Sequence, residues 1–165
     1  MLSKIRRWAR ELVIFLLLAG AVSLAVDYAR RPALPQGFSS EPLETIDGQR
    51  VDLAAMSQDR PLLVYVWATW CGVCRFTTPS VASLAAGGAN VVTVALRSGD
   101  NAVLAKGLQR RHLAAPTVND TRGQLAAQWG IQATPTIMIV YRGKITSITT
   151  GWTSGWGMRL RLWMA

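Results

Sequence analysis

Two cysteines three positions apart, Cys71 and Cys74, are the residues of this chain best suited to chemistry, and they are its only cysteines. They follow residues 62–67, an apolar run rich in β-branched and aromatic side chains that predicts a buried strand. Residues 75–86 predict a helix. A C-x-x-C at a strand-to-helix junction puts its first cysteine at a helix N-terminus, where the dipole favours the thiolate. Such a pair can close a small disulfide and exchange two electrons.

Two other kinds of site compete with this interpretation. A zinc site usually needs four ligands, and this chain has no further cysteine and a single histidine, His112. A structural disulfide stabilises mainly by closing a long loop, whereas these cysteines enclose only Gly72 and Val73. The pattern therefore favours redox chemistry, and we predict neither a metal site nor a bound cofactor.

The first thirty residues differ from the rest of the chain. A basic flank precedes an uncharged run at 12–26, and Trp8 and Tyr28 flank that run as aromatic residues do at membrane interfaces. Residues 8–28 are long enough to span a bilayer, so we predict one transmembrane helix with its basic flank in the cytoplasm. The alternative is a cleaved signal peptide, because residues 23–25 resemble a cleavage site. Either alternative exports the cysteines to a compartment where disulfides persist.

The remaining chain predicts a short linker and one domain. Residues 1–30 form the flank and anchor, residues 31–37 contain two prolines and a glycine typical of a linker, and residues 38–165 can bury a core.

The formal charge is +9, of which residues 1–31, with six basic and two acidic residues, contribute +4. The other +5 is spread over the domain without a dense run, so we predict no nucleic-acid binding.

Helical and strand patterns alternate along the domain, which predicts an α/β fold with a mixed central sheet flanked by helices. An Asp-Gly turn signal between 43–46 and 50–53 predicts a β-hairpin ahead of the central strand. The further predicted strands are 90–96, 116–118, 136–141 and 145–150, and the further helices are 53–58, 100–113, 123–129 and one from Ser154 onward. In that last helix Trp156, Leu160 and Trp163 share one face.

A second motif precedes the strand predicted at 136–141. Pro135 stands at its start, where proline is tolerated because it has no N–H to donate. Residues 66–74 and the Thr134-Pro135 pair resemble the active-site stretch and the cis-proline loop of the thioredoxin superfamily. The predicted hairpin is similar to that of the membrane-tethered TlpA-like and ResA-like branch.

Three further segments, 71–79, 94–99 and 151–154, are similar to the ScsD group, the tethered thiol–disulfide proteins of bacterial suppression-of-copper-sensitivity systems. The resemblance implies a thioredoxin-like fold with a cis Thr134–Pro135 peptide. It also implies that Cys71 is the nucleophile and Cys74 the resolving cysteine. The positions implied to support the cysteines or to contact the partner are Trp70, Gly72, Val73, Thr134 and Pro135.

The resemblance implies a thiol–disulfide oxidoreductase of the bacterial inner membrane, with a single span and a periplasmic C-terminal domain. Its expected partners are protein thiols and disulfides, among them a periplasmic thioredoxin-like protein and a transmembrane electron donor. We expect it to reduce partner disulfides. The alternatives are a net thiol oxidase and a copper-tolerance module in which the two thiolates hold Cu(I), a soft ion that selects sulfur.

Two positions depart from the family pattern. Tyr65 stands where many thioredoxins carry a buried acid, and Thr77 stands where ResA-like members carry a glutamate. Both usual proton acceptors for the buried thiol are therefore missing. Water or a backbone group would have to take the proton, which predicts slow reaction at Cys74.

Overall fold

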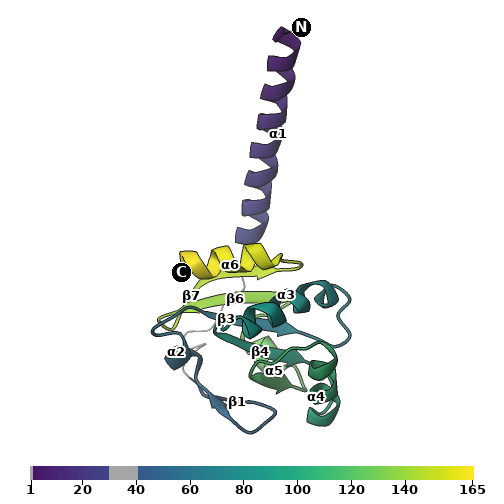
Figure 1. Cartoon of the computed structure of the whole chain (residues 1–165), viewed down its shortest axis with the longest axis vertical. Coiled ribbons are helices and arrows are strands. Elements are labelled where there is room, and N and C mark those ends of the chain that lie inside the picture. Colours follow the sequence, from purple (N-terminus) through teal and green to yellow (C-terminus); the bar gives the residue numbers. More distant parts are fainter. Residues whose placement is uncertain (1, 30–40) are drawn as a thin grey trace. The chain divides into compact units, whose positions relative to one another are not determined.

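The computed structural model describes residues 2–29 and 41–165 (Figure 1). The chain divides into two compact units, Met1–Arg31 and Pro32–Ala165. The linker predicted at 31–37 lies outside the described residues.

The first unit is the helix α1, Leu2–Ala29. Its backbone is described throughout, but the side chains of residues 2–5, 9, 16, 19 and 23–29 are not, so the span predicted at 8–28 lies partly outside the described side chains. In the part of the chain that is described, we find no helix with the length and apolar character needed to cross a membrane.

The second unit is built on a five-stranded mixed sheet in the order β5-β4-β3-β6-β7 (Figure 1). The strands are β3 (Leu62–Trp67), β4 (Val91–Leu96), β5 (Thr117–Asp120), β6 (Thr136–Tyr141) and β7 (Lys144–Thr150). β3 pairs in parallel with β4, and β4 with β5, whereas β6 is antiparallel to both β3 and β7. This arrangement confirms the predicted α/β fold with a mixed central sheet.

Helices cover both faces of this sheet. They are α2 (Leu53–Met56), α3 (Cys74–Ala86), α4 (Asn101–Arg110), α5 (Gln124–Gln128) and α6 (Gly155–Met164). α3, α4 and α6 bury Val81, Leu104 and Met158 in one core cluster. α2 packs Leu53 into the cluster on the other face, where Leu125 of α5 also packs.

The central strand β3 is buried on both faces. Leu63, Tyr65 and Trp67 belong to the first cluster, and Leu62, Val64 and Val66 belong to the second. A strand covered on both sides has no polar face, which is why its sequence is a continuous apolar run. Its bounds agree with the prediction.

Several elements differ from their predicted bounds. The strands β1 (Leu43–Glu44) and β2 (Arg50–Val51) pair antiparallel but are only two residues long each. β2 ends early because the Asp52 carboxylate accepts from the N–H of Ala55 and caps α2. α4 ends at Arg110 rather than 113, since His112 adopts a left-handed φ of 51°. β5 continues to Asp120 because its last residues pair with the end of β4.

Candidate active site

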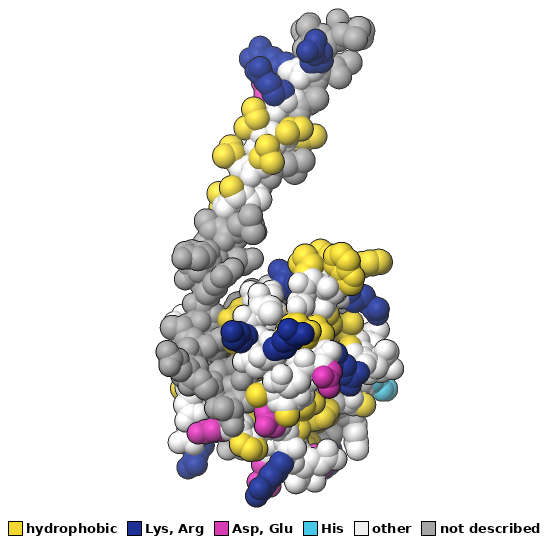
Figure 2. Space-filling view, turned by 90° about the vertical axis from the view of Figure 1, so that its left-hand side faces the viewer, with side chains coloured by type: hydrophobic (Ala, Val, Ile, Leu, Met, Phe, Trp, Pro, Cys, Tyr) yellow, Lys and Arg dark blue, Asp and Glu magenta, His cyan; other side chains and the backbone are white. Residues whose placement is uncertain are grey.

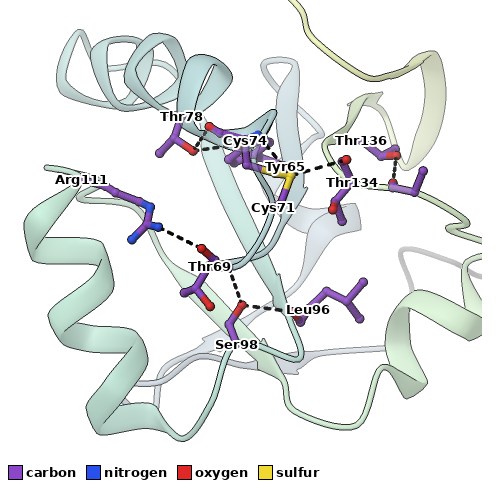
Figure 3. The surroundings of a disulfide bond; sticks show 11 residues. Tyr65, Thr69, Cys71, Cys74, Thr78, Leu96, Ser98, Arg111, Thr134 and Thr136 are labelled. Atoms are coloured by element: carbon purple, nitrogen blue, oxygen red, sulfur yellow. Dashed lines mark hydrogen bonds between the residues drawn. A yellow bond between two sulfur atoms is a disulfide. The ribbon is translucent and has the colours of Figure 1, made fainter.

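The two cysteines form a disulfide at the start of α3, with their Cα atoms 5.3 Å apart (Figure 3). Cys74 is the first residue of the helix, one position earlier than predicted, and Cys71 lies in the turn before it. The backbone N–H of Cys74 points at Sγ of Cys71, at 3.1 Å. An N–H donor at a helix N-terminus stabilises negative charge on the sulfur that it faces. The local backbone therefore favours a thiolate at Cys71 once the disulfide is reduced.

The two cysteines differ in exposure. Cys71 is 7% exposed and Cys74 is 1% exposed, while Gly72 and Val73 between them lie on the surface. A protein approaching this turn therefore meets Cys71 first. In the described part of the chain, no group of three or more His, Cys, Asp or Glu side chains is arranged to hold a metal ion.

The Thr134–Pro135 peptide is cis, as predicted, and it lies beside the disulfide (Figure 3). The carbonyl oxygen of Thr134 is 3.5 Å from Sγ of Cys71, although the two residues are 63 positions apart in the chain. The carbonyl oxygen of Pro135 accepts from the N–H of Gly151 at 2.8 Å, which holds the loop to the end of β7. The fold thus brings the two sequence motifs together at one site.

Trp70 lies on the surface next to the cysteines, 63% exposed. Its indole N–H donates to the carbonyl oxygen of Arg97 at 3.1 Å, in the turn that follows β4. Trp70 is therefore held at the surface by a polar contact and is not part of the core. Its implied role, to support the cysteines or to contact the partner, stays a prediction.

Tyr65, one of the two departures from the family pattern noted in the sequence, is fully buried. Its hydroxyl is hydrogen-bonded to Oγ1 of Thr78 at 2.9 Å, and the Thr78 hydroxyl also lies 2.7 Å from the carbonyl oxygen of Cys74 (Figure 3). Burial raises the pKa of Tyr65 to about 12, and the hydrogen bond to Thr78 and the charge of Arg111 oppose that shift only in part. Tyr65 stays neutral near pH 7 and supplies no proton acceptor.

Arg111 is a residue of the site that sequence reasoning missed. It follows the last residue of α4, and its guanidinium donates to the carbonyl oxygen of Thr69 at 3.3 Å and lies 5.3 Å from the centroid of the Trp67 ring. Ser98 accepts from the N–H of Thr69 at 2.9 Å and donates to the carbonyl oxygen of Leu96 (Figure 3). These contacts fix the segment between β3 and Cys71. No local sequence signal marks them, because Arg111 is 42 positions from Thr69.

The comparisons with known proteins agree with this geometry. The family model described as Redoxin matches residues 32–154. The chain belongs to the Redoxin family. A thioredoxin-like protein of Haemophilus influenzae is 41% identical to this redoxin over 144 residues, covering 87% of this chain and 86% of the relative. The thiol:disulfide interchange protein DsbE of Pseudomonas fluorescens biotype C is 32% identical over 148 residues, covering 85% of this chain and 83% of the relative.

Solved structures share the fold of this redoxin. A secreted Mycobacterium tuberculosis disulfide oxidoreductase homologous to E. coli DsbE superposes with a TM-score of 0.68 at 19% identity, covering 79% of this chain and 100% of that one. StoA from Bacillus subtilis gives a TM-score of 0.63 at 21% identity, covering 76% of this chain and 96% of the StoA chain. With the family match and the C-x-x-C disulfide, the redoxin is a thiol–disulfide oxidoreductase of the thioredoxin and DsbE type.

A groove of about 930 Å³ adjoins the site, lined by residues of α3 and of α4 and its C-terminal end. Pro79 and Ala82 give it an apolar floor, and Arg75, Arg110 and Arg111 add positive charge around it. Surface charge of one sign raises the local concentration of oppositely charged groups. The groove therefore combines apolar surface with positive charge.

Replacing Tyr65 by Phe tests the neutral-phenol interpretation. Because its pKa in the folded state exceeds the ordinary value of 10, stability from the neutral phenol is complete below pH 10 and is lost as the pH rises through about 12. We expect wild type to lose on the order of 1 kcal/mol more than Tyr65→Phe between pH 8 and pH 11, measured by urea unfolding. The pH profile of thiol exchange between pH 6 and 8 should be the same in both proteins. A changed profile there would show that the phenol handles a proton.

Proposed function

We propose that this chain is a membrane-tethered, periplasm-facing thiol:disulfide interchange protein that reduces partner disulfides. The observation that carries the proposal is the N–H of Cys74 directed at Sγ of Cys71 in an exposed turn. It gives the more accessible sulfur the greater thiolate character, which is the property required of an attacking nucleophile. In this proposal Cys71 attacks and Cys74 resolves.

The reaction begins from the reduced dithiol. The Cys71 thiolate attacks one sulfur of the partner disulfide, the partner S–S bond breaks, and the other partner sulfur leaves as a thiolate. The Cys74 thiol then passes its proton to the partner thiolate released in the first step, directly or through water, and the Cys74 sulfur attacks Sγ of Cys71. This second exchange releases the partner as a dithiol and forms the Cys71–Cys74 disulfide, so two electrons have passed to the partner. A donor dithiol must then reduce the Cys71–Cys74 disulfide.

The surroundings of the cysteines suit a protein partner. The carbonyl oxygen of Thr134 lies beside Sγ of Cys71, so the backbone of this loop forms part of the site. Near the cysteines in sequence, the exposed side chains of Trp70, Val73 and Phe76 add apolar surface. The partner class, protein disulfides, agrees with the name of the DsbE relative, a thiol:disulfide interchange protein. A periplasmic thioredoxin-like acceptor and a transmembrane donor remain the specific partners that we propose.

The proposed anchor is the segment 8–28, with the bacterial inner membrane as its location. Its support is the uncharged run 12–26 behind a basic flank. Large apolar side chains on successive turns of α1 are exposed, which a helix in water does not favour. They are Leu12, Val13, Ile14, Phe15, Leu17, Leu18 and Val22. The proposal predicts that alkaline carbonate leaves the full chain in the membrane fraction, whereas a cleaved leader would release the domain.

The resemblance to the ScsD group and to the TlpA-like and ResA-like branch stays part of the proposal. A copper-tolerance role is compatible with disulfide repair under copper stress, and a direct Cu(I) site would depend on the two thiolates alone in the described part of the chain. A Cu(I) titration of the reduced protein beside a thiol-exchange assay separates these roles. Tight binding without exchange activity would reverse our preference.

Limited alkylation tests the assignment of roles. We expect substoichiometric iodoacetamide to label Cys71 before Cys74 in the reduced full chain, because Cys71 is the more exposed and faces the helix N-terminus. Peptide mass spectrometry identifies the labelled residue. Labelling of Cys74 first between pH 5 and 8 would exchange the two roles.

A redox titration against glutathione buffers tests the direction of the reaction. A net reductant should equilibrate near the potential of thioredoxin, about −270 mV, whereas a net oxidase should approach the value of DsbA, about −120 mV. The oxidised fraction is counted by mass spectrometry after thiols are trapped with an alkylating agent. A value near the DsbA potential would replace reduction by oxidation in our proposal.

A further inference from the structure

The outer face of α6 carries large apolar side chains that the fold leaves in solvent. Trp156 is 84% exposed and Trp163 is 83% exposed, and Leu160 and Met164 are exposed beside them. The spacing i, i+4, i+7 and i+8 puts all four on one side of the helix. In Figure 2 hydrophobic side chains project from the edge of the second unit where Figure 1 draws α6, with basic side chains close by. Monomeric soluble proteins rarely expose such a patch without a use for it.

The same helix is held to the domain by its opposite side. Met158 is fully buried in the core cluster and Leu162 packs against that cluster. The Ser154 hydroxyl accepts from the N–H of Gly157 at 3.1 Å and caps the helix. Folding therefore uses Met158 and Leu162, and it places no demand on the two exposed tryptophans.

The stretch of sequence that contains α6 carries charge of one sign. Residues 121–165 contain five basic residues and no acidic residue. Two of the five, Arg159 and Arg161, belong to α6 itself, and Arg159 is exposed. Tryptophan and arginine on one helix surface, with no acidic side chain in residues 121–165, is the composition of helices that lie in the headgroup region of a bilayer.

We infer that the α6 face, Trp156, Leu160, Trp163 and Met164 with Arg159, is a binding surface for anionic phospholipid bilayers. The tryptophans enter the interface between headgroups and acyl chains, and Arg159 contacts the phosphate groups. A second copy of the chain fits the face less well. Symmetric pairing through α6 would bring the two sets of arginines together, and like charges across an interface are unfavourable.

Contact with a bilayer would also position the redox helix. The first residue of α6, Gly155, lies against α3: a Cβ added there would be in ordinary van der Waals contact with Ser80, 3.4 Å from its Oγ. A bilayer under α6 therefore holds α3, which begins at Cys74, close to the lipid surface. This suits exchange with membrane-embedded dithiols. The lipid contact itself requires neither redox activity nor the proposed anchor.

The test uses the full chain labelled with 5-fluorotryptophan, in nanodiscs of phosphatidylcholine with or without phosphatidylglycerol. Single Trp→Phe variants assign the fluorine resonances, and doxyl-labelled lipid broadens those near the acyl chains. We expect Trp156 and Trp163 to broaden in discs that contain phosphatidylglycerol and to sharpen at high salt. Trp67 and Trp129, both buried, should stay unchanged and serve as internal controls.

A charge variant on the same helix keeps every tryptophan label. Arg159→Gln should shift the bound-to-free ratio of the Trp156 and Trp163 signals roughly fivefold toward the free form in phosphatidylglycerol discs. Its matched control is Lys106→Gln, an exposed basic residue on α4, which should leave that ratio unchanged.

Three results would overturn the inference. Sharp Trp156 and Trp163 signals in both kinds of disc would show that lipid does not contact the face. Equal broadening with and without phosphatidylglycerol would remove the requirement for anionic lipid. Broadening that depends on protein concentration in the absence of doxyl lipid would assign the face to a second copy of the chain. Thiol-exchange activity is measured separately, so its loss or retention bears only on the proposed redox function.

Discussion

Replacing Cys74 by serine is expected to accumulate disulfide-linked complexes between this chain and its partners. Without a resolving thiol, the mixed disulfide at Cys71 has no intramolecular route to release the partner. The N–H of residue 74 that faces Sγ of Cys71 belongs to the backbone, so the variant keeps the donor that activates the nucleophile. The complexes should be visible as bands of higher mass on non-reducing gels from the native host, should vanish on reduction, and should be identifiable by mass spectrometry.

The control is Cys71→Ser, which keeps only Cys74, a residue that is 1% exposed. It should form few mixed disulfides, and both variants should lose catalysed reduction of a model disulfide to the uncatalysed background. Equal trapping by the two variants would contradict the assignment of Cys71 as nucleophile. A lack of trapping by either variant in the native host would remove the main support for interchange with protein partners.

Much of this site could be predicted from the sequence because its parts are local. Residues 62–67 are apolar on both sides of the strand, and the chain turns directly into the cysteine helix, so strand, turn and helix follow from one short stretch. The nearness of Thr134 to Cys71 did not follow from the residues alone. It was implied by the family resemblance, and the antiparallel pairing of β3 with β6 is what produces it.

Other features depend on contacts that no local pattern encodes. The bracing of Thr69 by Arg111 joins the end of α4 to the turn before the cysteines, and either residue alone resembles ordinary surface sequence. In α6 the helical period correctly groups Trp156 with Trp163, but it does not determine which side meets the core. Met158 is fully buried in the core cluster and Leu162 packs against it, so the side of α6 that bears these two residues meets the core.

Truncating Leu104 to alanine is expected to cause a large loss of stability, and its neighbour provides the matched control. Leu104 is fully buried and joins α4 to the core cluster that also contains Cys74, whereas Val103, one position earlier in the same helix, is exposed. Removing a buried leucine side chain usually costs about 2–5 kcal/mol of unfolding free energy, because transfer energy is lost and a cavity remains.

Val103→Ala should change the unfolding free energy by only about 0.5 kcal/mol, since the site is exposed and alanine is the better helix former. Urea unfolding of the oxidised full chain, followed by tryptophan fluorescence, measures both variants under one set of conditions.

Because α4 ends next to Arg111, which holds Thr69, partial undocking of the helix should also loosen the turn before Cys71. We therefore expect Leu104→Ala to raise hydrogen exchange at the N–H of Thr69, and Val103→Ala to leave it unchanged. Similar stability in the two variants would mean that α4 contributes little to the core.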